Sequence, residues 1–164
     1  MLSKTAEYAL RAVAAVARVR EDRPVLAKEI AAQGQIPTKY LSKVMRDLVH
    51  AGVLSSTRGI GGGFRLKRKP ETIKLVDVIR PFDDVQASRR CPFGNARCSD
   101  ENPCSMHDQW RPVAEAYRVL LEQTTIADII RKEKENATGR LANERPRVSM
   151  SRSRARNGKM KASS

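Results

Sequence analysis

The sequence predicts a mainly α-helical fold that contains one β-hairpin and ends in a long amphipathic helix. Three observations support this prediction. Short helical patterns fill the first 50 residues, a glycine-rich hairpin follows them, and an apolar stripe with helical spacing begins near residue 110. The chain has 164 residues, which is enough for one domain of ordinary size. We therefore expect a single domain with a long helix on its C-terminal side.

Two helices are predicted in the N-terminal part of the chain. Ser3 can cap a first helix that runs to about Val19, because its apolar residues recur at three- and four-residue spacing. A second, short helix fits residues 27–33. Gly34 is expected to end this helix, because glycine readily adopts the left-handed conformation that terminates helices.

A third helix and a hairpin follow. Pro37 suits the first turn of a helix that runs to about His50. Two short strand-like runs, residues 53–57 and 63–67, flank a glycine-rich tip at residues 58–62. Three helices followed by a hairpin are the order of elements in a winged helix-turn-helix, which is a DNA-binding fold.

Residues 1–70 are therefore interpreted as a winged helix-turn-helix DNA-binding region. In this fold the second helix of the motif reaches the base edges, and a slim hairpin with one arginine suits a narrow minor groove. Each single charge is as consistent with ordinary solvated surface, but the whole set favours binding to double-stranded DNA. The candidate DNA-binding residues are Thr38, Lys39, Tyr40, Ser42, Lys43, Arg46, Arg58 and Arg65.

The charge balance points to a polyanionic partner. The chain carries 32 Lys and Arg against 18 Asp and Glu, a formal net charge of +14. Such a surplus suits nucleic acid or an acidic membrane surface. No run of about 18 apolar residues is present, and the charged N-terminus lacks the features of a signal peptide. We therefore expect a cytoplasmic protein that binds DNA and no membrane.

The C-terminal part divides into four segments by composition. Residues 71–87 are expected to form a connecting helix and residues 88–107 a cysteine-containing loop. Residues 108–131 are expected to hold a long helix over about residues 109–121, which starts late or bends at Pro112, and one or two more helical turns at residues 126–130. Residues 132–164 are basic and poor in apolar side chains, so we expect a disordered tail that adds phosphate affinity or only solubility. The apolar stripe of the long helix consists of Trp110, Val113, Ala114, Tyr117, Leu120 and Leu121.

The three cysteines are clustered in a C-x6-C-x5-C-x2-H pattern, formed by Cys91, Cys98, Cys104 and His107. An odd number of cysteines without an export signal argues against a disulfide framework, so ligation or redox chemistry is the better interpretation. Three thiolates and one imidazole suit tetrahedral zinc and also suit an iron–sulfur cluster. Three reactive thiols can also form a metal-free redox switch, and the spacing alone does not choose among the three.

The pattern argues against an enzyme. The glycines at 61–63 lie in a hairpin rather than between a strand and a helix, so they do not form a nucleotide-binding loop. The only histidines are His50 and His107. A ferredoxin-like electron carrier would not need a net charge of +14, and a zinc-dependent RNA-binding protein would be colourless and bind single strands. A DNA-binding regulator accounts for more of the sequence than any of these rivals.

Four stretches carry a family resemblance. They are KTAEYALR at residues 4–11, Tyr40-Leu41, VLSSTRGIGGGFRL at residues 53–66, and the three-cysteine loop followed by His107 and Trp110. Together they resemble the winged-helix iron–sulfur regulators of the IscR, NsrR and RirA type, the Rrf2-type family. The resemblance covers about residues 1–130 and excludes the basic tail.

The resemblance implies that Cys91, Cys98 and Cys104 bind an iron–sulfur cluster, either 2Fe–2S or 4Fe–4S. IscR-like members use a histidine just after the third cysteine as the fourth ligand, and His107 matches it. NsrR-like members use an acidic residue from the first helix of the partner subunit, and Glu7 matches that; we favour His107. The six-residue gap between the first two cysteines is longer than in IscR or NsrR and shorter than in RirA, which favours a RirA-like, iron-responsive role.

The resemblance also implies a homodimer that pairs through the long C-terminal helix, residues 108–131. Two helix-turn-helix units on one two-fold axis would read a roughly palindromic site. Tyr40 and Arg58 align with DNA-contacting stretches, while Ser42 stands where IscR carries glutamate. The dimerisation residues would be Trp110, Val113, Tyr117, Leu120 and Leu121.

The expected function is that of a transcription repressor. Its operator affinity would be controlled by the cluster in response to iron or cluster status, nitric oxide or redox state. A zinc-stabilised protein and a metal-free thiol switch stay open as alternatives at the cysteine loop.

Overall fold

The structure of the chain is a computed structural model that describes residues 2–19, 23–85, 91, 93–94 and 99–143. It is mainly helical with one two-stranded antiparallel sheet, which confirms the predicted fold class. No helix in this part of the chain combines the length and apolar character that a bilayer span requires. The elements are α1 (Lys4–Arg18), α2 (Ala27–Gly34), α3 (Thr38–His50), β1 (Leu54–Thr57), β2 (Gly63–Leu66), the 3-10 turn η1 (Pro70–Thr72), α4 (Leu75–Ile79), α5 (His107–Gln123) and α6 (Ile126–Asn143).

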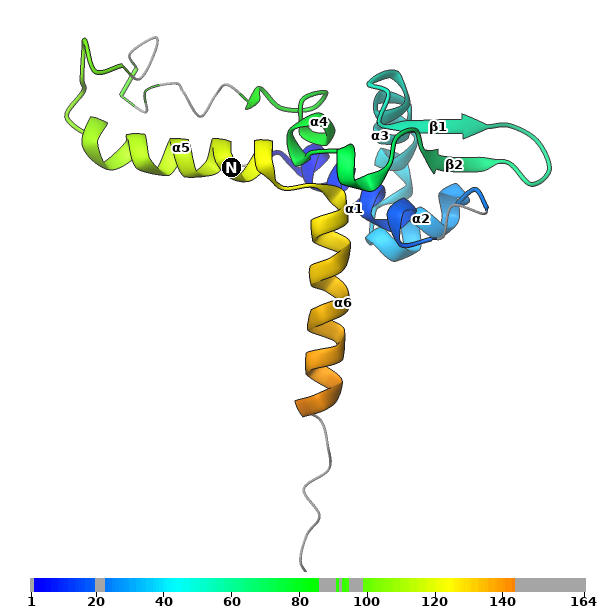
Figure 1. Ribbon diagram of the computed structural model, residues 1–164. Helices are drawn as coiled ribbons and strands as arrows, with labels where there is room; N and C mark the ends of the chain where they lie inside the picture. Colours follow the sequence, from blue (N-terminus) through cyan, green and yellow to red (C-terminus); the bar gives the residue numbers. More distant parts are fainter. Residues whose placement is uncertain (1, 20–22, 86–90, 92, 95–98, 144–164) are drawn as a thin grey trace, which may run out of the picture.

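Three parts are visible in Figure 1. The first is a compact module made of α1 to α4 and the hairpin, which we call the winged-helix module. The second is α5, which extends away from the module, and the third is α6, which leaves the module in a different direction. α1 is central to the module, because it packs against α2, α3, α4, α6 and β2, whereas α5 packs on α4.

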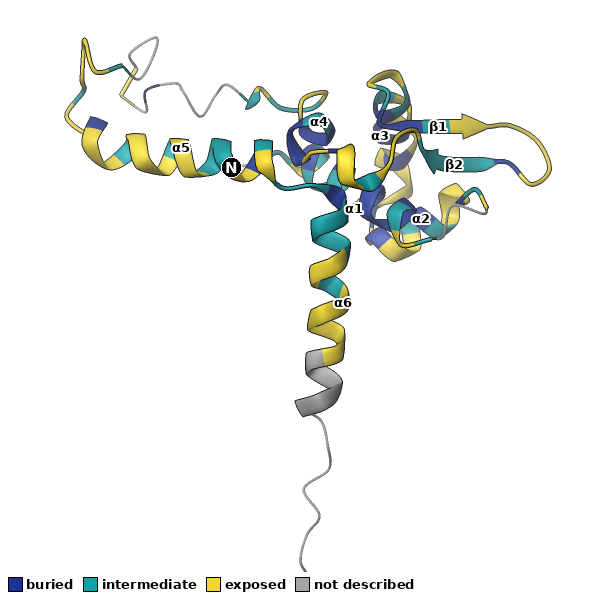
Figure 2. Ribbon diagram, viewed as in Figure 1, coloured by how far each residue is buried: buried dark blue, intermediate teal, exposed yellow. Residues whose placement is uncertain are grey.

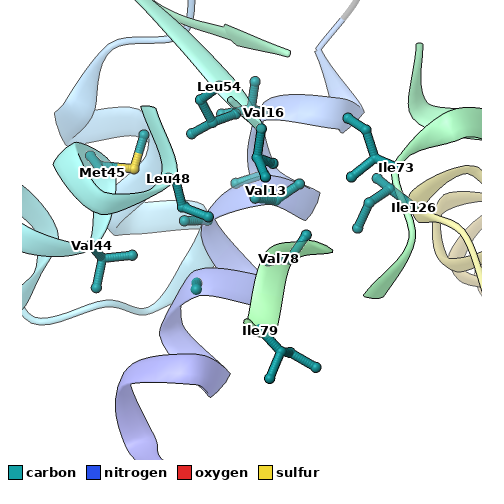
Figure 3. Packing of buried hydrophobic residues seen from close by; sticks show 14 of the residues in the cluster. Val13, Val16, Val44, Met45, Leu48, Leu54, Ile73, Val78, Ile79 and Ile126 are labelled. Carbon is teal, nitrogen blue, oxygen red and sulfur yellow. The ribbon is translucent and has the colours of Figure 1, made fainter. Parts of the chain in front are cut away.

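The hydrophobic core of the module surrounds α1. Val13 and Val16 on the inner face of this helix are buried. Leu48 of α3, Leu54 of β1 and Ile79 of α4 are buried against the same cluster (Figure 3). The predicted helical periodicities therefore converge on one core, and that core fixes the orientation of α3 and the hairpin.

The ends of α1 and α2 have different causes. Ser3 caps α1 as predicted, because its hydroxyl accepts a hydrogen bond from the backbone N–H of Ala6 at 3.2 Å. α2 ends at Gly34 as predicted, but the predicted reason for this end is wrong. Gln35, and not Gly34, adopts the left-handed conformation, with a φ of 51°. Gly34 is instead needed for packing, since a Cβ at this position would lie 2.8 Å from Cδ1 of Ile36.

The hairpin, or wing, pairs in the register that sets Leu54 opposite Leu66. A third short segment joins it, because Val25 and Phe64 exchange two backbone hydrogen bonds of 2.8 and 2.9 Å. This bridge ties the wing to the turn between α1 and α2. Hydrophobic periodicity does not predict it, because a single bridging residue leaves no pattern.

Two helices, α5 and the first turns of α6, cover residues 108–131. α5 ends at Gln123, and the chain turns at Thr124 and Thr125. The Leu75 N–H donates to the carbonyl oxygen of Thr124 at 3.0 Å, which fastens this turn to the start of α4. The long helix and the further turns predicted at residues 126–130 thus correspond to α5 and the start of α6, and Pro112 lies within α5, which begins at His107.

α6 corrects the predicted start of the basic tail. The helix continues to Asn143, so the prediction of disorder is wrong for residues 132–143. Its first turns are partly buried against the module, and most of residues 131–138 are exposed (Figure 2). Arg18 of α1 donates from Nε to Oε2 of Glu133 at 2.8 Å, which adds an ion pair between α1 and α6. The rest of the predicted tail, residues 144–164, lies outside the described residues.

Candidate DNA interface and cysteine site

The outer face of α3 carries most of the predicted DNA-contacting residues. The inner face of the helix is buried in the core, and the outer positions are exposed. The helical period therefore separates packing residues from candidate contact residues, as the sequence predicted. The exposed candidates on α3 are Thr38, Lys39, Tyr40, Ser42, Lys43 and Arg46.

Tyr40 on α3 is held by aromatic and cationic neighbours. Its ring lies against the ring of Tyr8 on α1, with centroids 5.6 Å apart and planes inclined by 32°. Nζ of Lys39 lies 5.0 Å from the Tyr40 ring centroid, and the Arg11 guanidinium lies 6.0 Å from that of Tyr8. Such contacts favour one ring orientation. Tyr8 is thus a positioning neighbour of the interface that the sequence analysis missed, although it lies within the stretch at residues 4–11.

The tip of the wing is exposed to solvent. Arg58 and Ile60 both lie in this tip, and Ile60 is fully exposed. The tip depends on glycine, because a Cβ on Gly62 would lie 2.3 Å from the carbonyl oxygen of Thr57. Arg65 is half-buried on β2. The structure therefore places Arg58 at the end of the wing and Arg65 on its strand.

Two of the predicted ligands, Cys104 and His107, lie together at the beginning of α5. Cys91 is buried, Cys104 is half-buried, and the side chain of His107 is only 6% exposed. The His107 N–H donates to the carbonyl oxygen of Cys104 at 3.0 Å, so these two residues share one turn. Cys98 lies outside the described residues, and within those residues no three metal-ligating side chains come together. The described residues therefore include only three of the four predicted ligands, Cys91, Cys104 and His107.

A carboxylate that the sequence analysis missed contacts His107. Oδ1 of Asp100 lies 2.8 Å from Nε2 of His107. Arg111 donates from Nη1 to both carboxylate oxygens of Asp100, at 2.9 and 3.1 Å. The pKa of Asp100 is lowered, first by the hydrogen bond from His107 and then by the positive charge of Arg111. The contact depends on how the loop folds back on α5, so no spacing rule could have revealed it.

Trp110, the single tryptophan of the chain, lies one turn after His107 on α5. Its Nε1 is buried and has no hydrogen-bond partner among the described residues. A buried donor without an acceptor costs about 1–3 kcal/mol, so an acceptor from outside the described residues would stabilise this site. The thiols, the imidazole and this indole N–H fit an iron–sulfur cluster, whose sulfur atoms accept hydrogen bonds.

Glu7, the alternative fourth ligand, is engaged within its own helix. Nζ of Lys4 lies 2.9 Å from its Oε2, and Nη2 of Arg11 lies 3.7 Å from the same atom. The pKa of Glu7 is lowered, mainly by the hydrogen bond from Lys4. A cluster in a partner subunit would have to compete with both cations for this carboxylate.

The apolar stripe of α5 is buried at its C-terminal end, and its other members are half-buried or exposed (Figure 2). Leu121 is buried in the core cluster, and Trp110 and Tyr117 are half-buried. Val113 and Leu120 are 57% and 53% exposed. Packing on the same chain therefore accounts for only part of the predicted stripe, and exposed apolar groups on one helix are typical of interaction surfaces.

The chain is similar to known transcriptional regulators over most of its length. The Rrf2 family model, described as an iron-dependent transcriptional regulator, matches residues 2–132. A putative HTH-type transcriptional regulator of Aquifex aeolicus is 36% identical over 138 residues, which cover 83% of this chain and 95% of that protein. IscR, an HTH-type transcriptional regulator of Yersinia pseudotuberculosis, is 30% identical over 153 residues, covering 88% and 93%. The structure of CymR, the global cysteine regulator of B. subtilis, matches with a TM-score of 0.66 at 23% identity, covering 80% and 97%.

Proposed function

Because the chain belongs to the Rrf2 family of transcriptional regulators, we propose that it is a DNA-binding repressor whose operator affinity is controlled by an iron–sulfur cluster. The family relatives are transcriptional regulators, which confirms the prediction that the chain is not an enzyme. One observation carries the cluster proposal. The segment that joins the winged-helix module to α5 buries the thiol of Cys91. At the start of α5, the buried imidazole of His107 lies one turn before Trp110, whose indole N–H has no hydrogen-bond partner among the described residues.

DNA binding is assigned to the exposed face of α3 and to the tip of the wing. Lys39, Lys43 and Arg46 are exposed cations on α3 that suit phosphate oxygens, and lysine also reaches guanine. Arg58 at the wing tip suits a narrow minor groove, because such grooves attract guanidinium groups. Since the two elements pack on the same core, they would meet the DNA as one rigid surface.

Cys91, Cys98 and Cys104 would hold the cluster, with His107 as the fourth ligand. When bound, an iron–sulfur cluster supplies a centre that is sensitive to iron supply and oxidation. The ligating residues lie in the segment between α4 and α5, so ligation ties this segment to the first turn of α5. Without ligation the segment is released, and the two α3 helices of a dimer change their spacing or order. A coupling free energy of about 1–3 kcal/mol would change operator affinity by roughly 5- to 150-fold.

The proposed dimer pairs through α5. Val113 and Leu120 are large apolar residues that stay exposed on this helix in the single chain. Burying them against the same helix of a second copy would remove apolar surface from water. Trp110, Tyr117 and Leu121 would flank this contact. Two copies related in this way present two α3 helices to one roughly palindromic operator.

The decisive experiment is an absorption spectrum with iron, sulfide and zinc analysis on full-length protein purified without oxygen. We expect a brown protein with broad visible absorption and acid-labile sulfide. Cys98→Ala should lose the cluster, keep the helical circular dichroism of the native chain, and no longer change its operator affinity with iron supply. Ser99→Ala, at the neighbouring position, is the matched control and should behave as wild type. A Cys98→Ala protein without cluster but with full regulation would refute the proposal.

The second candidate is a regulator that binds no iron, either as a metal-free thiol switch or as a zinc-stabilised protein. The metal-free form is favoured by the shared fold with CymR, a protein named a cysteine regulator. The same analysis separates these forms. One zinc per chain without sulfide would support the zinc form. A colourless, metal-free protein whose DNA affinity changes with thiol oxidation would support the switch.

A further inference from the structure

We propose that Asp100 is a positioning residue for His107, which it holds in the orientation and tautomer that offer Nδ1 to the cluster. This inference rests on the function proposed above. It adds a role for a residue that is neither a thiol nor an imidazole and that lies outside the predicted ligand set.

The contact between the two side chains sets the tautomer. Oδ1 of Asp100 lies 2.8 Å from Nε2 of His107, and an ionised carboxylate can only accept hydrogen bonds. Nε2 therefore carries the hydrogen, and in a neutral imidazole the lone pair then lies on Nδ1. A histidine that ligates a metal commonly donates its other ring N–H to a carboxylate in this way, which fixes the ring and raises its basicity.

Burial makes this orientation effective. The His107 side chain is 6% exposed, whereas that of Asp100 is 74% exposed. Water can therefore reach the carboxylate but has little access to the imidazole. The backbone N–H of His107 also donates to the carbonyl oxygen of Cys104 at 3.0 Å, so one turn carries two of the proposed ligands. Asp100 determines which edge of the buried ring faces the solvent.

Arg111 gives the carboxylate a second contact, which separates two possible roles of Asp100. Nη1 of Arg111 lies 2.9 and 3.1 Å from the two oxygens of Asp100, and Arg111 follows His107 by one helical turn. If Asp100 only tethered the loop to α5, loss of the ion pair with Arg111 would matter as much as loss of the bond to His107. If Asp100 positions His107, only loss of the hydrogen bond to His107 affects the cluster.

The test compares iron release from reconstituted full-length protein to a ferrous chelator under anaerobic conditions. Asp100→Ala should release iron about 10- to 100-fold faster than wild type, the range typical for loss of a partner of a metal-ligating residue. Asp100→Asn should stay within about threefold of wild type, because its amide oxygen accepts the same N–H. Arg111→Gln should do the same, and Glu101→Ala, an exposed carboxylate in the same loop, should match wild type.

A second readout uses the protein without a cluster. The Nε2–H proton of His107 should be protected from exchange and visible by ¹⁵N-edited NMR in wild type and Asp100→Asn, and it should disappear in Asp100→Ala. His50, the other histidine of the chain, is exposed, so its ring proton should exchange too fast to interfere. The proton should also stay visible in Arg111→Gln, because the hydrogen bond between Asp100 and His107 does not need Arg111, whereas a role that only tethers the loop would be lost in that variant.

The outcomes distinguish this inference from the function on which it rests. A brown wild-type protein whose Asp100→Ala variant releases iron at the wild-type rate overturns the inference alone. The inference also fails if Asp100→Asn releases iron as fast as Asp100→Ala does. It fails as well if Arg111→Gln releases iron as fast as Asp100→Ala does. A colourless wild-type protein overturns the cluster proposal itself, and the inference falls with it.

Discussion

In the winged-helix module, the 15-residue α1 buries seven of its residues, whereas the 17-residue α5 buries only His107 and Leu121. Both helices carry an apolar stripe of similar regularity. α1 lies at the centre of the module and is covered by four other helices and by β2, while α5 extends from the module and packs on α4 (Figure 1). The apolar stripe of α1 is therefore buried by other parts of the same chain, whereas much of the apolar stripe of α5 is not.

The difference shows what each region needs in order to be complete. The module closes its own core, so its shape and its DNA-binding face follow from one chain. α5 exposes Val113 and Leu120 and carries the indole N–H of Trp110, which is unpaired among the described residues. These features favour a region whose final structure depends on a second copy and on a bound group. Regulation would then act on α5 and the segment before it, and would change how the winged-helix module binds DNA.

The largest expected effect comes from the module core. Leu48→Ala removes a fully buried side chain and should lower the free energy of unfolding by about 2–5 kcal/mol. The loss should be the same at all protein concentrations. Leu120→Ala is the matched control on α5, and its effect should depend on concentration because it acts through the dimer. Thermal or urea unfolding over a range of protein concentrations measures both, and a concentration-independent loss in Leu120→Ala would contradict the comparison.

The next effect tests the surface of α5. Leu120→Glu places a charge on the proposed dimer contact and should raise the dimer dissociation constant by about 30- to 1,000-fold, which is roughly 2–4 kcal/mol. Analytical ultracentrifugation measures this change. Glu115→Gln also changes the charge of α5 but lies on the opposite side of the helix, so it should leave the dimer intact. If Leu120→Glu stays as dimeric as wild type, α5 is not the contact.

Most of the module could be predicted from the sequence, because its signals are local. The helix period, the cap at Ser3 and the glycine-rich wing each specify a structure within a few residues. The contacts that could not be predicted join segments far apart or depend on a loop. The Val25–Phe64 bridge and the Tyr8–Tyr40 contact are of the first kind, and the Asp100–His107 hydrogen bond is of the second.

The error at α6 has a physical origin. The sequence suggested one or two helical turns at residues 126–130 and a disordered tail after residue 131, because the residues that follow are basic and poor in apolar side chains. The chain turns at Thr124, whose carbonyl oxygen accepts a hydrogen bond from the backbone of Leu75, and α6 then continues to Asn143. Contact with the module overrides the local pattern. α6 therefore belongs with the module, to which the ion pair between Arg18 and Glu133 also connects it.

A smaller effect is expected at the wing. Arg58→Ala should weaken operator binding by about 1–3 kcal/mol if the guanidinium enters a narrow minor groove, and should leave cluster content unchanged. Lys43→Ala should weaken binding to all sequences alike and reduce the salt slope by about 1, because it removes one phosphate contact. Fluorescence anisotropy at several salt concentrations separates the two variants. Unchanged operator affinity in Arg58→Ala would remove the wing tip from the interface.

The smallest effect concerns the start of α6, where the module ends. Asp128 accepts hydrogen bonds from the backbone N–H of Thr125 at 3.0 Å and from its hydroxyl at 2.6 Å. These two bonds lower the pKa of Asp128, with a further contribution from Arg131. A carboxyl whose pKa is lower in the folded state stabilises the fold above its unfolded-state pKa, and this stabilisation is lost as the pH falls through the lowered value.

Asp128→Asn should therefore unfold at a slightly lower temperature than wild type near neutral pH. The difference should shrink as the pH falls below about 4, the ordinary range for an aspartate, and disappear once the wild-type carboxyl is protonated. Thermal unfolding followed by circular dichroism across this pH range measures the difference, with Asp108→Asn on the exposed start of α5 as the control. Since α6 packs on α1, its loss should appear in the main unfolding transition of the module. A separate, earlier transition in Asp128→Asn would instead assign α6 to the incomplete region and move the boundary between the two regions to the end of α4.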